Sequence, residues 1–365
     1  MVLHLMGSRT MYTKDTYQMI GKYFNTPEEE HCFVGKFPDD ENYAGNYCRV
    51  FQSRSPQMLR ALYESDYIIV HGLLNKLVVI LLALQPWLLK KCCWIVWGGD
   101  IYIHEKANKS AMEKLVERMK RFIIPRIPYV ATLVDADYGL AQKWYGAAGK
   151  QLPIIYPVPS SNQSLMESLP KTKHQGLDGI SILLGNSATE TNQHFQALDW
   201  LARFRDENIR VYLPLSYGSG DFHAYAQKVI DYAVELFGDK VYPVTEQMSG
   251  DDYLRFLNDM DVGLFNNNRQ QAMGNISQLI LCGAKVYIRT DTKMWGHFRS
   301  LGCSLHDIGE LAGMERLEEL TEEPADTKAA NQAVIAKRHD MRFKVEQWES
   351  LLNTLRQGKD KETNG

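Results

Sequence analysis

The chain has 365 residues, of which 45% are hydrophobic and 23% are charged, and its formal net charge is −3. This composition excludes an intrinsically disordered chain, and the length predicts roughly two globular domains. The six cysteines form no Cys-x-x-Cys pair and no zinc-site spacing, which indicates reduced thiols. Because the first residues are typical of a strand and not of a signal peptide, we expect a cytoplasmic protein. We expect no nucleic-acid partner.

Strands and helices alternate through the first half of the chain. Short apolar runs predict strands at 2–6, 31–35, 67–70, 93–97 and 129–134, a helical pattern covers 12–23, and a polar loop covers 37–46. The segment Leu77–Leu84 is apolar on every side. It is far shorter than the about 20 residues that a membrane span needs, so we expect a buried helix.

The strand at 93–97 runs into Gly98-Gly99-Asp100, which places a carboxylate at the carboxyl end of the strand. Ligands of open α/β sheets bind at those ends, so Asp100 is a candidate catalytic residue. His71, at the end of the strand at 67–70, and His4 in the first strand are alternatives. The competing interpretation is that Asp100 caps the next helix and that each histidine is only packed and hydrogen-bonded.

The segment Lys106–Arg126 combines apolar residues at helical spacing with many Lys and Arg residues. It predicts an amphipathic basic helix. Two interpretations stay open: a solvated helix face, or a surface that contacts anionic lipid headgroups. Phe122, Ile123 and Ile124 add membrane contact only where the core leaves them exposed.

A Pro- and Ser-containing joint, placed between Pro157 and Asp178, separates two halves of similar architecture. In the second half we expect strands at 180–184, 210–213, 241–244, 261–265 and 285–288, with helices between them. The predicted organisation is a domain at 1–158, a second domain at 178–325, and a C-terminal region at 326–365. This last region holds a helix from about Thr327 to Leu355 and a tail from Gln357 that we expect to be disordered.

Gly185-Asn186-Ser187 connects an apolar strand to a helix. Glycine allows close approach of the backbone, the Asn and Ser side chains supply donors, and the N-terminus of the helix favours an anion. The alternative is an ordinary turn made of turn-forming residues.

A second polar run, Asn266–Gln271, follows the strand at 261–265 and precedes a helix that begins near Gly274. The N–H groups of that helix favour a phosphate, and Arg269 can donate a charge-assisted hydrogen bond. Asn266 or Gln270 can bond a sugar hydroxyl or a base edge. The alternative is a polar loop with solvated amides.

Six short motifs, in this order and spacing, resemble glycosyltransferase family 56. They are His4-Leu-Met-Gly-Ser8, His71-Gly72, Trp97-Gly-Gly-Asp-Ile-Tyr102, Leu184-Gly-Asn-Ser187 with Asn192 and His194, Leu213-Pro-Leu-Ser-Tyr-Gly218, and Arg269-Gln-Gln271 with Gly274. Named members of this family are TDP-N-acetylfucosamine:lipid II N-acetylfucosaminyltransferases. The resemblance extends from residue 2 to about residue 300.

The resemblance implies an α/β protein of the GT-B glycosyltransferase fold, with two Rossmann-like domains facing a cleft and a C-terminal helix. It implies transfer of a 4-acetamido-4,6-dideoxyhexose from a TDP-sugar to a lipid-diphosphate-linked saccharide, without a metal, at the inner face of the cell membrane. The second domain would bind the nucleotide-sugar donor and the first the acceptor and the anionic membrane surface. The expected donor-binding residues are Gly185, Asn186, Ser187, Tyr217, Gly218, Asn266, Arg269, Gln270 and Gly274. Asp100 would be the general base, with His71 and His4 as alternatives.

Three other functions stay open from the sequence. They are a transferase that uses a UDP-sugar, a non-catalytic nucleotide-sugar or polysaccharide binding protein, and a nucleotide-sugar epimerase. Asp135-Ala-Asp137 is the nearest pattern to a metal-binding Asp-x-Asp motif, and we expect it to cap a helix instead. A Rossmann oxidoreductase is not favoured, because no Gly-x-Gly-x-x-Gly follows a strand.

Overall fold

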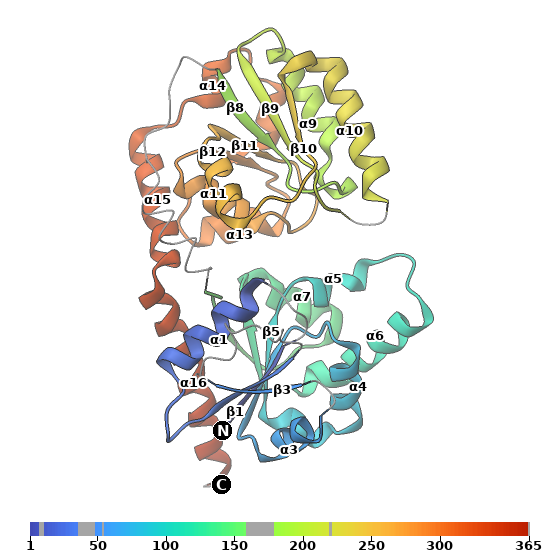
Figure 1. The fold of residues 1–365 in the computed structure, drawn as a ribbon, viewed down its shortest axis with the longest axis vertical. Coiled ribbons are helices and arrows are strands. Elements are labelled where there is room, and N and C mark those ends of the chain that lie inside the picture. The colour runs from blue at the N-terminus through green and yellow to red at the C-terminus, as the bar shows by residue number, and fades with distance from the viewer. Residues whose placement is uncertain (7–10, 36–47, 53–54, 158–178, 219–220, 364–365) are drawn as a thin grey trace. The chain divides into compact units, whose positions relative to one another are not determined.

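The computed structural model describes residues 1–6, 11–35, 48–52, 55–157, 179–218 and 221–363 (Figure 1). The chain forms two compact units: unit 1 consists of Met1–Ser160 and His339–Gly365, and unit 2 of Ser161–Arg338. The expected loop at 37–46, most of the joint between Pro157 and Asp178, and Gly7-Ser8 of the first motif lie outside the described residues.

The sheet of unit 1, as far as the chain is described, has seven parallel strands in the order β3-β2-β1-β4-β5-β6-β7. The strands are β1 Val2–Met6, β2 His31–Gly35, β3 Arg49–Gln52, β4 Tyr67–His71, β5 Cys92–Val96, β6 Tyr129–Thr132 and β7 Lys150–Pro153. β1, β2, β4 and β5 are buried at every position, as parallel strands with helices on both faces are. The strand order reverses between β1 and β4, so their carboxyl ends form the topological switch point of this unit.

Helices pack on both faces of this sheet. One apolar cluster joins it to α3, α4, α6 and α7, and another joins it to α1 and α16. The helices are α1 Met11–Tyr23, α3 Pro56–Glu64, α4 Lys76–Leu84, α5 Gly99–Tyr102, α6 Ala111–Ile123, α7 Asp135–Tyr145 and α16 Met341–Thr363. α6 starts at a capping box in which Ser110 and Glu113 bond each other's backbone N–H groups. The expected basic segment is therefore helical only after its first lysines.

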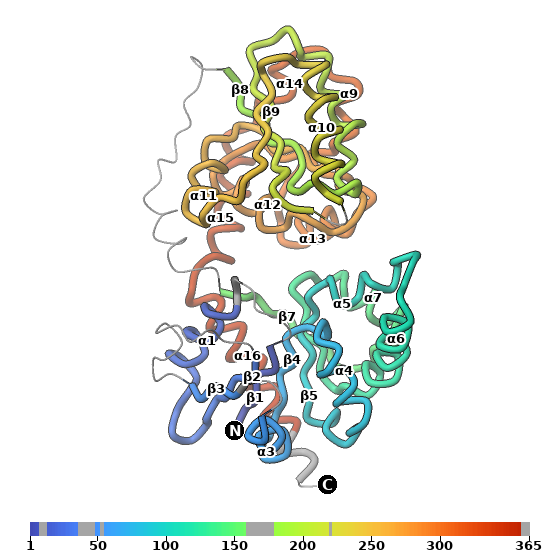
Figure 2. The backbone as a smooth tube through the Cα atoms, turned by 45° about the vertical axis from the view of Figure 1, so that its right-hand side comes forward, coloured from blue at the N-terminus to red at the C-terminus, as the bar shows by residue number. Residues whose placement is uncertain are grey.

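α4 is less buried than its sequence predicts. Only Val79 and Leu82 are buried, whereas Leu77 is 46% and Leu84 is 69% exposed. The helix lies beside α6 (Figure 2) and packs against the sheet with one side only. Its other apolar side chains consequently face outward, because a short helix on the outer layer of a sheet has one neighbouring core to bury them in.

The C-terminal region also differs from expectation. The single predicted helix is divided at Asp340 into α15 Ala325–His339 in unit 2 and α16 in unit 1, and the Asp340 carboxylate accepts a hydrogen bond from the Arg342 N–H. α16 continues through Thr363, where we expected disorder. Trp348 of α16 is fully buried in unit 1 and donates to the Ile155 carbonyl at 2.9 Å. Trp348, and the ion pair of Arg356 with Glu29, attach α16 to unit 1.

The sheet of unit 2 has, within the described ranges, six parallel strands in the order β10-β9-β8-β11-β12-β13. The strands are β8 Ile180–Leu184, β9 Ile209–Pro214, β10 Val241–Val244, β11 Val262–Phe265, β12 Lys285–Ile288 and β13 His306–Asp307. The helices are α9 His194–Leu201, α10 Phe222–Phe237, α11 Gly250–Asn258, α12 Met273–Leu281, α13 Lys293–Ser300, α14 Leu317–Thr321 and α15. The order reverses between β8 and β11, and both expected donor loops follow these two strands.

Candidate functional site

The first expected donor loop lies at the switch point of unit 2, directly after β8. Gly185 has φ +75°, and a Cβ at this position would lie 2.6 Å from Nε2 of His194 and 3.0 Å from Oδ1 of Asn192. Only glycine fits both this left-handed backbone and this close packing. The turn itself therefore requires Gly185, independently of any ligand.

A network of buried amides joins the loop after β8 to the loop after β11. Oδ1 of Asn192 accepts hydrogen bonds from the Asn186 N–H at 2.9 Å and from Nδ2 of Asn267 at 3.0 Å. Nδ2 of Asn267 also lies 3.1 Å from Oδ1 of Asn186 and 3.3 Å from Oε1 of Gln271. Oγ of Ser187 accepts from Nδ2 of Asn192 at 3.2 Å. The two amide-rich loops thus satisfy each other's polar groups at the edge of the sheet.

Two atoms of this region have no hydrogen-bond partner among the described residues: Oδ1 of Asn267 and Nε2 of His194, both in fully buried residues. Turning the Asn267 amide around would remove its nitrogen from three acceptors, so the oxygen stays an unpaired acceptor. Leaving a buried acceptor without a hydrogen bond lowers the free energy of unfolding by about 1–3 kcal/mol. A hydroxyl or N–H group of a ligand, or a bound water, would satisfy it. Burial lowers the pKa of His194 to about 3, so this ring is neutral.

Tyr217 and Gly218 close over the same loop from the end of β9. The Tyr217 hydroxyl accepts from Nδ2 of Asn186 at 2.9 Å, and its carbonyl accepts from the Ala188 N–H at 2.7 Å. A Cβ at Gly218 would lie 2.2 Å from the Ala188 carbonyl oxygen, so glycine permits this approach. The Tyr217 side chain is 55% exposed and is accessible to a ligand.

The second expected donor loop contains buried and exposed members. Asn266 is buried, Gln270 is half-buried, and Arg269 and Gly274 are exposed. Arg269 has no hydrogen bond or ion pair within the part of the chain that the structure describes. At Gly274 an added Cβ would meet open space, so the first turn of α12 is sterically open on that side.

Arg289 is a cation that the sequence analysis missed. It follows β12, reaches Oδ1 of Asn266 at 3.5 Å, and forms two hydrogen bonds with Asp291 at 2.9 and 2.6 Å. The available sequence signal was a charged residue directly after the apolar strand at 285–288. Only the sheet order, with β12 beside β11, shows that this strand end adjoins the amide loops.

In unit 1, Asp100 is fully buried in the short helix α5. One carboxylate oxygen accepts from the Leu73 N–H at 2.9 Å and from Nε1 of Trp94 at 2.8 Å, and the other accepts from the Trp97 N–H at 3.0 Å. Burial raises the pKa of Asp100, although these hydrogen bonds and the Lys120 ammonium oppose the shift. This geometry holds the turn after β5 to the end of β4.

His4, in the middle of β1, and His71, at the carboxyl end of the neighbouring strand β4, are both fully buried and their rings contact each other. Nδ1 of His4 and Nε2 of His71 are 3.0 Å apart, and His71 bonds the Tyr156 hydroxyl through Nδ1. Burial lowers the pKa of both rings, to about 3 for His71. His31 and Tyr156, which the sequence analysis did not select, belong to the same group.

The outer face of α6 carries two exposed stripes. Met112, Leu115 and Phe122 form an apolar stripe, 47%, 44% and 40% exposed. Lys114, Arg118 and Arg121 follow the neighbouring face at helical spacing. A cavity of about 330 Å³ adjoins the basic stripe, and its lining is completed by His104, Lys109 and Glu117.

Not all expected residues of this segment reach that surface. Lys120 is buried and donates to the Asp100 carbonyl at 2.7 Å, and Ile123 and Ile124 are fully buried. Membrane contact can therefore use Phe122 but neither isoleucine. Among the described helices, none is both long and apolar enough to cross a bilayer.

The structure thus divides the selected residues into two groups. Gly185, Asn186, Ser187, Tyr217, Gly218 and Asn266 gather at one edge of the unit 2 sheet, with Arg269, Gln270 and Gly274 on the loop and helix that follow β11. Asp100, His71 and His4 lie inside unit 1. No group of three or more His, Cys, Asp or Glu among the described residues is placed to hold a metal ion.

Two units that each contain a parallel, Rossmann-like sheet, together with C-terminal helices, define the GT-B class of glycosyltransferases. Solved structures share this fold. The structure entitled trehalose-6-phosphate from E. coli, with UDP-2-fluoro glucose, matches with a TM-score of 0.64 at 11% identity over 98% of this chain and 99% of that chain. Sucrose-phosphate synthase from Thermosynechococcus elongatus matches with a TM-score of 0.65 at 13% identity over 97% and 98%. A glycosyltransferase from Rickettsia africae gives 0.66 at 8% identity over 97% and 98%.

Within this class, the model of the family described as 4-alpha-L-fucosyltransferase, glycosyl transferase group 56, matches residues 58–308. The match covers well over half of the chain. The chain therefore belongs to glycosyltransferase group 56 and is an enzyme of the hexosyltransferase type.

Proposed function

We propose that the protein transfers a 4-acetamido-4,6-dideoxyhexose of the N-acetylfucosamine type from a TDP-sugar to a lipid-diphosphate-linked saccharide. Membership of group 56 supports the class of sugar. The proposed location of the nucleotide-sugar site rests on the amide-lined switch point of unit 2, where the buried side-chain oxygen of Asn267 has no hydrogen-bond donor among the described residues. A hydroxyl of the sugar or of the ribose would donate the hydrogen bond that this oxygen lacks.

In this proposal the loops after β8, β9 and β11 hold the nucleotide sugar. The buried amides fix the loops, Tyr217 and Gln270 offer polar contacts, and the exposed guanidinium of Arg269 neutralises the leaving diphosphate. The open first turn of α12 at Gly274 leaves room for a phosphate beside its N–H groups.

Asp100, His71 and His4 stay candidates for the general base, but their geometry favours positioning. All three are fully buried, both Asp100 oxygens already accept hydrogen bonds, and the histidines bond each other. Their contribution to transfer, in our proposal, is to hold the turn at Trp97 at the carboxyl edge of the unit 1 sheet.

We also propose that unit 1 contacts the lipid-linked acceptor and an anionic membrane surface through α6, at the inner face of the cell membrane. The apolar stripe beside a basic stripe supports this surface, since an amphiphilic acceptor with a diphosphate offers the complementary chemistry.

Binding and turnover with a panel of nucleotide sugars test the proposal. We expect thermal stabilisation by TDP and TDP-sugars exceeding that by UDP-sugars, and release of TDP only when a lipid-linked acceptor is present. A preference for UDP-sugars would assign another donor. Binding without transfer to any acceptor would favour a non-catalytic binding protein, and interconversion of the sugar without an acceptor would favour an epimerase.

A further inference from the structure

A continuous line of hydrogen-bonding side chains crosses the interior of unit 1. Three histidines on adjacent strands form its centre: His31 on β2, His4 on β1 and His71 on β4. Nδ1 of His31 lies 3.0 Å from Nε2 of His4, and Nδ1 of His4 lies 3.0 Å from Nε2 of His71. All three residues are fully buried.

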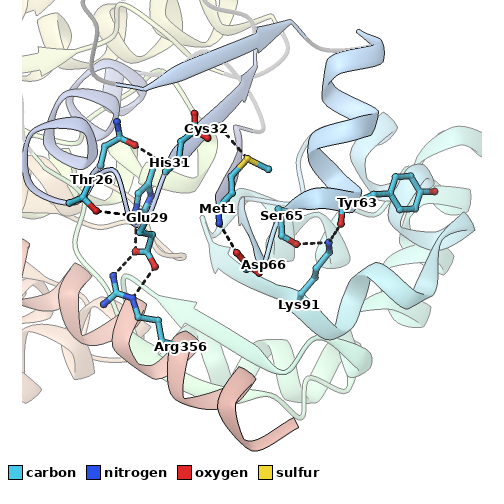
Figure 3. Close-up of polar contacts among 12 residues, drawn as sticks. Met1, Thr26, Glu29, His31, Cys32, Tyr63, Ser65, Asp66, Lys91 and Arg356 are labelled. Atoms are coloured by element: carbon cyan, nitrogen blue, oxygen red, sulfur yellow. Dashed lines mark hydrogen bonds and ion pairs between the residues drawn. The ribbon is translucent and has the colours of Figure 1, made fainter. Parts of the chain in front are cut away.

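The line continues beyond the histidines at both ends. At one end Nδ1 of His71 bonds the Tyr156 hydroxyl, which accepts a hydrogen bond from Nε1 of Trp97 at 2.8 Å. At the other end Nε2 of His31 faces the carboxylate of Glu29 at 3.4 Å. Figure 3 shows Glu29 between His31 and Arg356, whose guanidinium donates two hydrogen bonds to it.

The chemistry of the two ends sets the direction of every hydrogen bond. The indole of Trp97 only donates, and the carboxylate of Glu29 only accepts. In the opposite direction, a neutral His31 would point a nitrogen lone pair at the carboxylate. In the forward direction Tyr156 donates to His71, His71 to His4 and His4 to His31, so no ring needs an added proton. The remaining N–H of His31, on Nε2, then faces the Glu29 carboxylate at 3.4 Å.

Burial favours neutral rings at His4 and His71, and the neighbours of Glu29 favour an ionised carboxylate. Burial lowers the pKa of His4 and His71 well below that of a free imidazole. Burial alone would raise the pKa of Glu29, but hydrogen bonds from His31 and Arg356 outweigh it and lower this pKa to about 2. Phe33 stacks on His4 with 4.4 Å between ring centroids, which keeps the ring in the line.

α16 contacts this line at two places. Arg356 anchors its Glu29 end, and Trp348 stacks on His71 at 6.0 Å and meets Tyr156 edge-on at 6.1 Å. At the far end, the Trp97 backbone is held by Asp100 while its side chain is held by Tyr156. The docked helix is therefore connected to the turn after β5 through the buried rings.

We infer that the three histidines are neutral and protonated on Nε2, forming one polarised hydrogen-bond chain from Trp97 to Glu29 in which His4, His31, His71 and Tyr156 are positioning residues for the carboxyl edge of the unit 1 sheet. The chain transmits the docking of α16 to the side chain of Trp97. Its effect on turnover rests on the proposed function, whereas its protonation pattern does not.

Nuclear magnetic resonance of the whole protein with ¹⁵N-labelled histidine tests the pattern at pH 8. We expect three neutral rings protonated on Nε2, connected in sequence by couplings across the two ring-to-ring hydrogen bonds. Nδ1-protonated rings at His4 and His71, or an imidazolium at His31, would overturn the inference.

A variant separates this chain from ordinary packing. Glu29→Met removes the accepting end but keeps a side chain of similar length, so Nδ1-protonated forms of His4 and His71 should appear and kcat should fall about tenfold with an unchanged KM for the donor. Glu28→Met, at the exposed neighbouring glutamate, is the matched control and should match the parent protein. Unchanged histidine spectra in Glu29→Met would refute the chain, whereas altered spectra without any sugar transfer in the parent would refute only the proposed function.

Discussion

Asp100 illustrates how burial changes the meaning of a carboxylate at a strand end. Its position after β5 predicts chemistry, yet its two oxygens accept three hydrogen bonds, from the N–H of Leu73 after β4, the indole of Trp94 in β5 and the N–H of Trp97 after β5. A carboxylate whose two oxygens both accept hydrogen bonds is held in one position. We therefore expect replacement of Asp100 to destabilise the turn after β5 more than it impairs a proton transfer.

Replacement of Asp100 by Asn distinguishes these roles. The new amide NH₂ would face N–H donors, so we expect Asp100→Asn to reduce the free energy of unfolding by about 1–3 kcal/mol. Urea denaturation measures this loss, and Asp135→Asn, at an exposed aspartate in the first turn of α7, serves as the control. Full stability combined with a large loss of turnover would instead assign Asp100 as the general base.

Arg269 is the residue on which donor affinity depends most directly in our proposal. Arg269→Ala should weaken TDP binding by about 1–3 kcal/mol, the range for a lost charge-assisted hydrogen bond. Isothermal titration calorimetry with TDP and UDP measures it. Arg205→Ala is the control, since Arg205 precedes β9 at the opposite edge of the sheet. Equal affinities in parent and Arg269→Ala would remove this residue from the site.

Among the helices, α6 shows that an amphipathic pattern can either pack its apolar face into the core or leave apolar residues on the surface. Its sequence separates apolar from basic residues, but the core buries Val116, Lys120 and Ile123 and leaves the apolar stripe of Met112, Leu115 and Phe122 exposed. An apolar stripe that stays outside the core beside a basic stripe is a surface for an amphiphilic partner.

Liposome co-sedimentation tests this surface. The parent protein should bind anionic vesicles at low salt and dissociate as salt rises, because each suitably placed Lys or Arg contributes about 1 kcal/mol near an anionic leaflet and salt screens it. Reversal of Lys114, Arg118 and Arg121 to Glu should abolish binding. The matched control reverses Lys228, Arg255 and Lys293, exposed cations of unit 2, and should bind like the parent. Sedimentation of both triple variants would show that α6 is only a solvated face.

At the scale of the whole molecule, buried neutral histidines link stability to pH. Burial lowers the pKa of His71 and His194 to about 3 and that of His297 to about 4. In the unfolded chain these rings take up protons near pH 6.5, so the unfolded state binds more protons below that value. Their contribution is complete above pH 6.5 and is lost as the pH falls toward the folded-state pKa.

We therefore expect the free energy of unfolding to fall steeply between pH 6.5 and about pH 4, by roughly 1.4 kcal/mol per pH unit for each buried neutral ring. Urea denaturation at pH 7.5, 6.0 and 5.0 measures the slope. His194→Gln should make it shallower, and His223→Gln, at an exposed histidine, should not. A stability independent of pH in this range would show that these rings are protonated in the folded protein.

The alternation of strands and helices could be read from the sequence alone, because a parallel strand covered on both faces is buried along its whole length, as β1, β4 and β12 are, and its residues are therefore mostly apolar. It also marked the loops after β8 and β11, where glycine and amides are concentrated. It missed the four-residue strand β3, and it missed α3 although Ser55, Pro56 and the spacing of Met58, Ala61 and Leu62 are typical of a helix start and an apolar helix face. It also overestimated the burial of α4.

Which of these residues meet depends on the tertiary fold. The order of strands brings β11 beside β8 and β4 beside β1, and this order is set by long-range packing that no local pattern records. For that reason the pairing of Asn186 with Asn267, the place of Arg289 and the line from His31 to Trp97 become visible only in the folded chain. A side chain's type is local, whereas its burial and its partners depend on neighbours far away in the sequence.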